Sequence, residues 1–106
     1  MAEDSLELVY VSAQILRQRF RELRIVERAE AGELTLVVHK RSLALESRRQ
    51  PAGTETQRII YFQGQLRVAV CHRYVLPDGS VGASGLPDPK WLRDGNRILM
   101  IESPTA

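Results

Sequence analysis

The sequence has few of the residues on which small domains often rely. It contains one cysteine, Cys71, two histidines and one tryptophan, and no apolar run exceeds four residues. A single cysteine excludes an internal disulfide and a zinc site built from several cysteines. A membrane-spanning helix needs about 20 consecutive apolar residues, so none is predicted. Residues 1–4 are Met-Ala-Glu-Asp, an acidic start that lacks the basic end of a secretion signal. These absences predict a cytoplasmic protein without membrane contact.

Length and composition predict one domain spanning residues 1–106. A chain of 106 residues lies within the usual size range of a single domain. Hydrophobic residues make up 43% of the chain and charged residues 26%, values that are ordinary for a globular protein. We find no internal repeat and no low-complexity segment that would divide the chain.

Lysine is scarce, and arginine supplies nearly all of the positive charge. Thirteen of the fifteen basic side chains are Arg, and the two lysines are Lys40 and Lys90. Arginine is the better residue for two-pronged contacts with phosphate, although a GC-rich genome would produce the same excess. The net charge of +2 is small for a dedicated nucleic-acid-binding protein. A local basic surface is nevertheless compatible with it.

The spacing of apolar residues predicts a long helix over residues 6–24, with Asp4 or Ser5 as its N-cap. One face of this helix would pack on a sheet, and it is formed by Val9, Ala13, Leu16, Phe20 and Leu23. A second apolar stripe, on another side, consists of Leu8, Val11 and Ile15. Either deeper burial of the first half of the helix or a homodimer contact would explain this second stripe.

Four arginines would also share one face if the helix continued beyond residue 24. They are Arg17, Arg21, Arg24 and Arg28, spaced by four, three and four positions. Such a stripe is usually a solvated face. The alternative is a ridge that contacts the phosphates of a nucleic acid.

The remainder of the chain is predicted to form a mainly antiparallel sheet over residues 34–101. Strands are expected at 34–39, 58–62, 66–76 and 97–101, and the middle two form a hairpin around a turn at 63–65. Residues 25–29 suit either a short strand or the end of the helix. A loop is expected at 42–56, and an irregular segment at 77–96 would contain a short helical turn over 90–92. The predicted fold class is therefore α+β, with one long N-terminal helix packed on an antiparallel sheet of four or five strands.

Two groups of polar residues in the second half of the chain are candidates for chemistry. The first is a ligand loop for a small anion, made of Arg73, Gly82, Ser84, Gly85, Lys90 and Trp91. Its glycines would let backbone N–H groups approach the anion, but they also serve simply to turn the chain, with Trp91 filling the edge of the core. No phosphate-loop or dinucleotide-binding motif is present.

The second group consists of His72 and Tyr74, which alternate along one strand and so share a face. With nearby arginines they are candidate acid–base groups for a small ribonuclease. No metal site is predicted, because His39 and His72 lack the spacing of metal ligands, and no cofactor is predicted either. Cys71 lies in an apolar strand run and is predicted to be buried and unreactive.

Two resemblances bear on function. The layout of a helix followed by a basic antiparallel sheet is similar to that of toxin ribonucleases of the RelE/ParE kind, in architecture only. The stretch HRYVLPDGSVGASGLPDPK at 72–90 resembles a C-terminal segment of small bacterial proteins of unknown function. This second resemblance implies a bacterial or phage-like origin and no activity.

The leading hypothesis is a non-enzymatic interaction module that acts as a homodimer. The contact would use Leu8, Val11 and Ile15, or an exposed strand edge. The chief alternative is a nucleic-acid-directed binder or toxin-type ribonuclease that uses the arginine stripe. A third hypothesis is a binder of a small anionic ligand at residues 82–90. The sequence identifies no particular protein partner.

Overall fold

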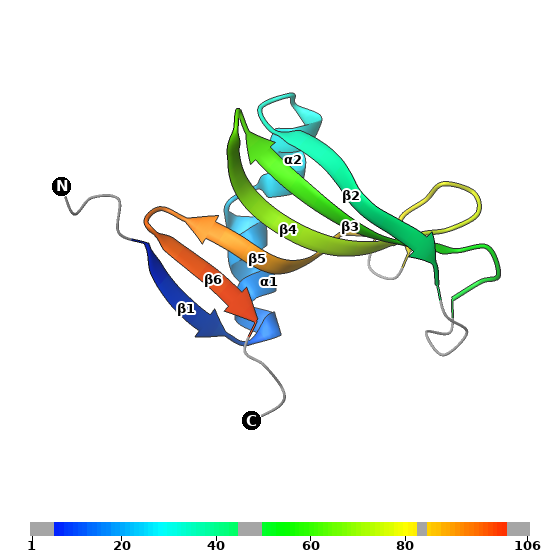
Figure 1. The fold of residues 1–106 in the computed structure, drawn as a ribbon, viewed down its shortest axis with the longest axis horizontal. Coiled ribbons are helices and arrows are strands. Elements are labelled where there is room, and N and C mark those ends of the chain that lie inside the picture. The colour runs from blue at the N-terminus through cyan, green and yellow to red at the C-terminus, as the bar shows by residue number, and fades with distance from the viewer. Residues whose placement is uncertain (1–5, 45–49, 83–84, 102–106) are drawn as a thin grey trace.

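The computed structural model describes residues 6–44, 50–82 and 85–101, which form one sheet and two helices (Figure 1). Along the chain the elements are β1 (Glu7–Val11), α1 (Ala13–Glu22), α2 (Ile25–Glu30), β2 (Thr35–Leu43), β3 (Glu55–Gln63), β4 (Leu66–Val75), β5 (Asp88–Asp94) and β6 (Arg97–Ile101). The strand order is β1-β6-β5-β4-β3-β2. Every neighbouring pair is antiparallel except β1 and β6, which run parallel.

The two helices carry the chain from one edge of the sheet to the other. β1 and β2 form opposite edges, and α1 and α2 lie between them in sequence on the same side of the sheet (Figure 1). The fold is therefore α+β, with a sheet that is mainly antiparallel, as predicted. Among the described residues, no helix is long and apolar enough to cross a membrane.

The long N-terminal helix is a wrong prediction. Residues Glu7–Val11 form β1, and the helix begins only after Ser12, whose hydroxyl accepts a hydrogen bond from the Ile15 N–H at 3.2 Å. Branched and aromatic residues at 9–11 suit a strand, and β6 supplies their hydrogen-bonding partner. The predicted caps at residues 4 and 5 lie outside the described residues. At its other end the helix stops near Arg24, whose left-handed φ of 56° separates α1 from α2.

The predicted number of strands is also wrong, because the sheet has six strands instead of four or five. The additional strands are β1 and β5, and β5 occupies the place of the short helical turn expected at 90–92. Residues 25–29 belong to helix α2. The hairpin of β3 and β4, the strand at 34–39 within β2 and the last strand, β6, are confirmed.

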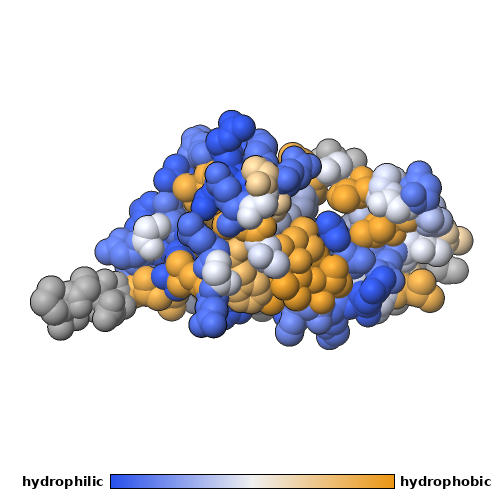
Figure 2. All heavy atoms as spheres, turned by 90° about the horizontal axis from the view of Figure 1, so that it is seen from above, coloured by the Kyte–Doolittle hydropathy of each residue, from blue (hydrophilic) through white to orange (hydrophobic). Residues whose placement is uncertain are grey.

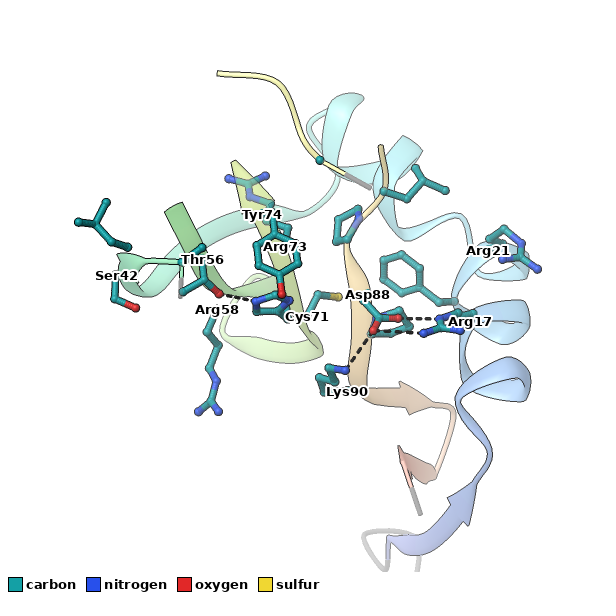
Figure 3. A pocket seen from close by; sticks show the side chains of 18 residues that line it. Arg17, Arg21, Ser42, Thr56, Arg58, Cys71, Arg73, Tyr74, Asp88 and Lys90 are labelled. Atoms are coloured by element: carbon teal, nitrogen blue, oxygen red, sulfur yellow. Dashed lines mark hydrogen bonds and ion pairs between the residues drawn. The ribbon is translucent and has the colours of Figure 1, made fainter. Parts of the chain in front are cut away.

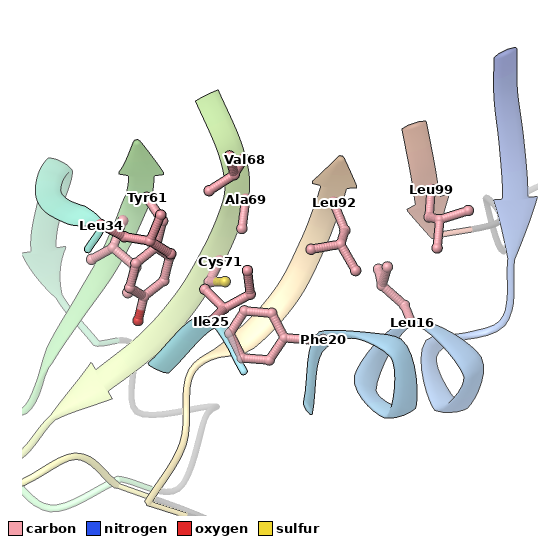
Figure 4. Packing of buried hydrophobic residues seen from close by; sticks show 11 residues of the cluster. Leu16, Phe20, Ile25, Leu34, Tyr61, Val68, Ala69, Cys71, Leu92 and Leu99 are labelled. Carbon is pink, nitrogen blue, oxygen red and sulfur yellow. The ribbon is translucent and has the colours of Figure 1, made fainter. Parts of the chain in front are cut away.

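The hydrophobic core lies between the helices and one face of the sheet (Figure 4). Leu16 and Phe20 of α1 are buried, as predicted, and Ile25 of α2 joins them. They pack on side chains from β3, β4, β5 and β6, namely Ile59, Tyr61, Ala69, Cys71, Leu92 and Leu99. Residues that alternate along a strand face opposite sides of the sheet, and a bulge in β4 places the adjacent Val68 and Ala69 both in the core.

Ion pairs also fix α1 on the sheet. Arg19 donates two hydrogen bonds to the carboxylate of Asp94, at 2.8 and 3.0 Å, and Arg97 donates another at 3.1 Å. The Asp94 side chain is only 10% exposed. Closer to the cavity described below, Arg17 donates to Asp88 at 2.7 Å. Hydrogen bonds from the arginines outweigh burial and hold the pKa of Asp94 below its usual range.

We predict that Cys71 does not react in the native protein. The side chain is fully buried, and this burial raises the pKa of the thiol far above its ordinary value. Ellman's reagent, at mildly alkaline pH, is therefore expected to label Cys71 only after denaturant unfolds the chain. Labelling of the folded protein at the rate of a free thiol would contradict this position of Cys71 in the core.

Candidate anion-binding site

A cavity of about 1090 Å³ opens beside the first residues of β5 (Figure 3). It forms because β5 begins opposite His72, whereas β4 continues to Val75 without β5 beside it. Helix α1 borders the cavity on one side, and the ends of β3 and β4 border it on another. Its polar lining consists of Arg17, Arg21, Ser42, Thr56, Arg58, His72, Arg73, Tyr74, Asp88 and Lys90.

The charge of this lining is strongly positive. Five of the lining residues are cations and one is a carboxylate, so positive charges exceed negative ones by four. Asp88 accepts hydrogen bonds from Arg17 at 2.7 Å and from Lys90 at 3.0 Å. Burial raises the pKa of Asp88, but these two cations outweigh it and leave the pKa below its usual range. Asp88 is thus ionised at neutral pH and shared by two cations.

The other three cations form no ion pair with any carboxylate that the structure describes. Arg73 donates from Nε to the side-chain oxygen of Gln57 at 2.9 Å. Neither Arg21 nor Arg58 has a side-chain partner among the described residues. Both side chains are exposed, so their guanidinium donors are directed to solvent or to a ligand.

His72 is held firmly at the edge of the cavity. Its Nε2 shares a hydrogen bond with the hydroxyl of Thr56, and its ring stands nearly perpendicular to that of Tyr74, with centroids 4.8 Å apart. Thr56 and Tyr74 are cross-strand neighbours on β3 and β4. The arrangement places an imidazole that can transfer a proton among several cations.

The structure divides the predicted arginine stripe. Arg17 and Arg21 line the cavity, whereas Arg24 lies at the break between the helices and Arg28 donates to Glu33 at 3.2 Å. The stripe required one continuous helix, and the left-handed residue at position 24 turns the second half away. The four arginines therefore do not form one ridge.

The predicted ligand loop is also only partly assembled. Arg73, Gly82 and Lys90 line the cavity, while Gly85 and Trp91 do not, and Ser84 lies outside the described residues. The N–H of Gly82 donates to the Tyr74 carbonyl at 2.8 Å, and that of Gly85 donates to Gly82 at 3.1 Å. The backbone N–H groups of Gly82 and Gly85 are therefore already paired, so among the described residues the side chains of the lining are the candidates for holding an anion.

The apolar stripe predicted for a dimer is not a stripe in the structure. Leu8 and Val11 are three residues apart in strand β1, so they face opposite sides of the sheet, and Ile15 lies on helix α1. Val11 packs against the core, while Leu8 is 58% exposed and Ile15 52% exposed. Self-association stays a prediction, but these three residues do not make one contact surface.

Three residues of the cavity lining, Arg58, Thr56 and Asp88, were not among the predicted site residues. Arg58 and Thr56 alternate with Ile59 and Gln57 along β3, which puts them on the same face as His72 in the neighbouring strand. The alternation itself was visible in the sequence, but the register between β3 and β4 was not. Asp88 was not assigned to the predicted ligand loop, and the helical turn expected shortly after it, at 90–92, is part of β5 instead.

Comparison with protein-family models, with curated proteins and with solved structures found no match. The two resemblances therefore remain resemblances. Among the described residues, no three His, Cys, Asp or Glu side chains group together in a way that would hold a metal ion. His39 and His72 lie on β2 and β4, which are separated by β3.

Proposed function

We propose that this protein is a binding module that holds an anionic, phosphate-bearing ligand in the basic cavity. The observation that carries the proposal is the excess of four positive charges around one open cavity (Figure 3). Like charges around one cavity repel one another, and an anion bound among them relieves that repulsion. A ligand with several negative charges suits this excess better than a single carboxylate.

The geometry also suits phosphate chemically. Arg21 and Arg58 have guanidinium groups without a side-chain partner among the described residues, and a guanidinium group can bind phosphate oxygens in a two-pronged manner. Lys90 contributes a point charge that it shares with Asp88. The side chains come from α1, β3 and β5, three segments far apart in sequence, so folding builds the site.

A second candidate function is cleavage of a phosphodiester. The observation that favours it is the position of His72 among these cations, beside Thr56 and Tyr74. A time course with a short RNA tests it, with His72→Gln as the variant. If His72 transfers a proton in the reaction, the variant retains RNA binding but loses cleavage; cleavage at the wild-type rate would rule out that role.

The homodimer predicted from the sequence also remains a proposal. Light scattering on a concentrated sample measures the molar mass directly. A monomer would restrict function to the single chain described above, and a dimer would require a contact surface other than the three-residue stripe.

Binding of inorganic pyrophosphate tests the principal proposal. We expect calorimetry at low salt to show binding, and the double variant Arg21→Gln/Arg58→Gln to weaken it by roughly tenfold to a hundredfold for each arginine that contacts the ligand. The control is the double variant Arg24→Gln/Arg28→Gln, which removes the same two charges at positions outside the cavity lining. The proposal fails if the wild type does not bind, or if the control weakens binding as much as Arg21→Gln/Arg58→Gln does.

A further inference from the structure

The sheet face that points away from the helices carries an unbroken apolar row. The row crosses all six strands, and each member is the cross-strand neighbour of the next: Tyr10, Met100, Trp91, Val70, Ile60 and Val37. None of them belongs to the core cluster under the helices. The ends of the row are exposed, with Tyr10 60% and Val37 42% exposed, whereas Ile60 in its interior is only 9% exposed. Figure 2 views the molecule at right angles to Figure 1, from above, and shows hydrophobic residues near the middle of that side.

Cations accompany this row. The guanidinium carbon of Arg67 lies 4.9 Å from the centroid of the Trp91 ring, and Arg93 donates to the Arg67 carbonyl at 3.3 Å. Arg58 lies two positions before Ile60 on β3, and its cross-strand neighbour on β2 is Lys40. Within the part of the chain that the structure describes, the one carboxylate in register with Lys40, Arg58 and His72 is Asp88, which already forms ion pairs with Arg17 and Lys90.

The sheet face that points away from the helices, here called the open face, is continuous with the basic cavity. Arg58 and His72 are neighbours in register, and each lies two positions from a member of the apolar row, Ile60 or Val70. The same two side chains line the cavity. A ligand longer than one phosphate can therefore contact the cavity and the open face at once.

The charges on this face distinguish between possible occupants. A second copy, related by two-fold symmetry, would bring Arg67, Arg93 and Arg58 against the same cations with no carboxylate to compensate them. An anionic strand with exposed bases matches both features. Bases stack on aromatic rings and on guanidinium planes, while the phosphates pair with the arginines. A duplex keeps its bases stacked inside, so a single strand is the better match.

We infer that the open sheet face binds single-stranded nucleic acid, with bases stacked on Tyr10 and on the Trp91–Arg67 pair and the backbone directed past Arg58 into the cavity. This inference rests on the proposed function and names its ligand. It predicts an affinity that falls steeply with salt, because the contacts to phosphate release counterions.

The test uses labelled twelve-nucleotide oligo(U) and oligo(dT) with the full chain. Binding is measured by fluorescence anisotropy and by quenching of Trp91, the only tryptophan in the chain. We expect both oligonucleotides to bind more tightly than pyrophosphate and to quench Trp91. Tyr10→Ala should weaken their binding by about fivefold to a hundredfold, and Tyr10→Phe should retain it. Ile15→Ala is the control, since it removes an exposed apolar side chain from helix α1.

The outcomes separate the inference from the proposed function. If pyrophosphate binds but the oligonucleotides bind no better, or if Tyr10→Ala has no effect on them, the inference fails and the cavity proposal stands. If neither pyrophosphate nor an oligonucleotide binds, both fail. A dimer that Tyr10→Ala dissociates, in a protein that does not bind the oligonucleotides, would assign the face to a second copy and overturn the inference.

Discussion

Replacing Leu16 by alanine is expected to lower the free energy of unfolding by about 2–5 kcal/mol. The side chain is completely buried between helix α1 and the sheet, so truncation leaves a cavity in addition to the lost hydrophobic contact. A domain of this size has a total stability of about 5–15 kcal/mol, so the variant loses a large part of it.

Ile15 is the matched control for this prediction. It precedes Leu16 on the same helix but is 52% exposed, so Ile15→Ala should change the free energy of unfolding by about 0.5 kcal/mol or less. Urea denaturation of both variants measures the two changes. Equal losses at the two positions would contradict the orientation of α1 on the sheet.

Replacing Asp94 by asparagine is expected to cost about 1–3 kcal/mol at neutral pH. The isosteric amide keeps the size of the side chain but loses the negative charge that Arg19 and Arg97 share. Because the Asp94 side chain is only 10% exposed, water compensates poorly for the lost hydrogen bonds. The chief consequence is weaker attachment of α1 to the turn between β5 and β6.

The effect of Asp94 should also depend on pH in a defined direction. Hydrogen bonds from Arg19 hold its pKa in the folded protein below the ordinary value of 3.8. A carboxyl group whose pKa is lower in the folded than in the unfolded protein stabilises the fold fully at pH values above its unfolded-state pKa. This stabilisation is lost as the pH falls through its folded-state pKa. The difference between wild type and Asp94→Asn should therefore shrink as the pH is lowered from 7 through about 4 to 3. A difference that stays constant in urea titrations over this range would contradict the ion pair.

Local patterns in the sequence were enough to predict much of the sheet. Alternating and branched residues around a glycine turn identified the β3–β4 hairpin, and the apolar run at 97–101 identified β6. The helical spacing of Leu16 and Phe20 correctly identified the buried side of α1. In each case the residues that decide the structure are neighbours in sequence.

The N-terminal strand was not predictable in the same way. Val9 fits the helical spacing that leads to Leu16, and it also alternates with Tyr10 as a strand residue does. The deciding partner is β6, some 90 positions further along the chain, where Leu99 lies opposite Val9. Tertiary contact of this kind overrides local preference and leaves no local signal.

The site was predicted in pieces but not as a whole. Arg17 and Arg21, His72 and Tyr74, and Arg73, Gly82 and Lys90 were assigned to three separate hypotheses, and the fold brings all seven to one cavity. Only the register of β3, β4 and β5 shows that these segments meet. The same register adds Arg58, which no pattern within its own strand distinguishes from a solvated arginine.

Phosphate binding in the cavity is best tested by an NMR titration of the isotopically labelled protein with pyrophosphate at low salt. We predict saturable shifts that are largest at the cavity, in Arg21, Arg58, His72 and Lys90, with no change in β1. Shifts that do not saturate, or that spread over all exposed arginines, would show that the cavity has no particular affinity for phosphate and would contradict the account.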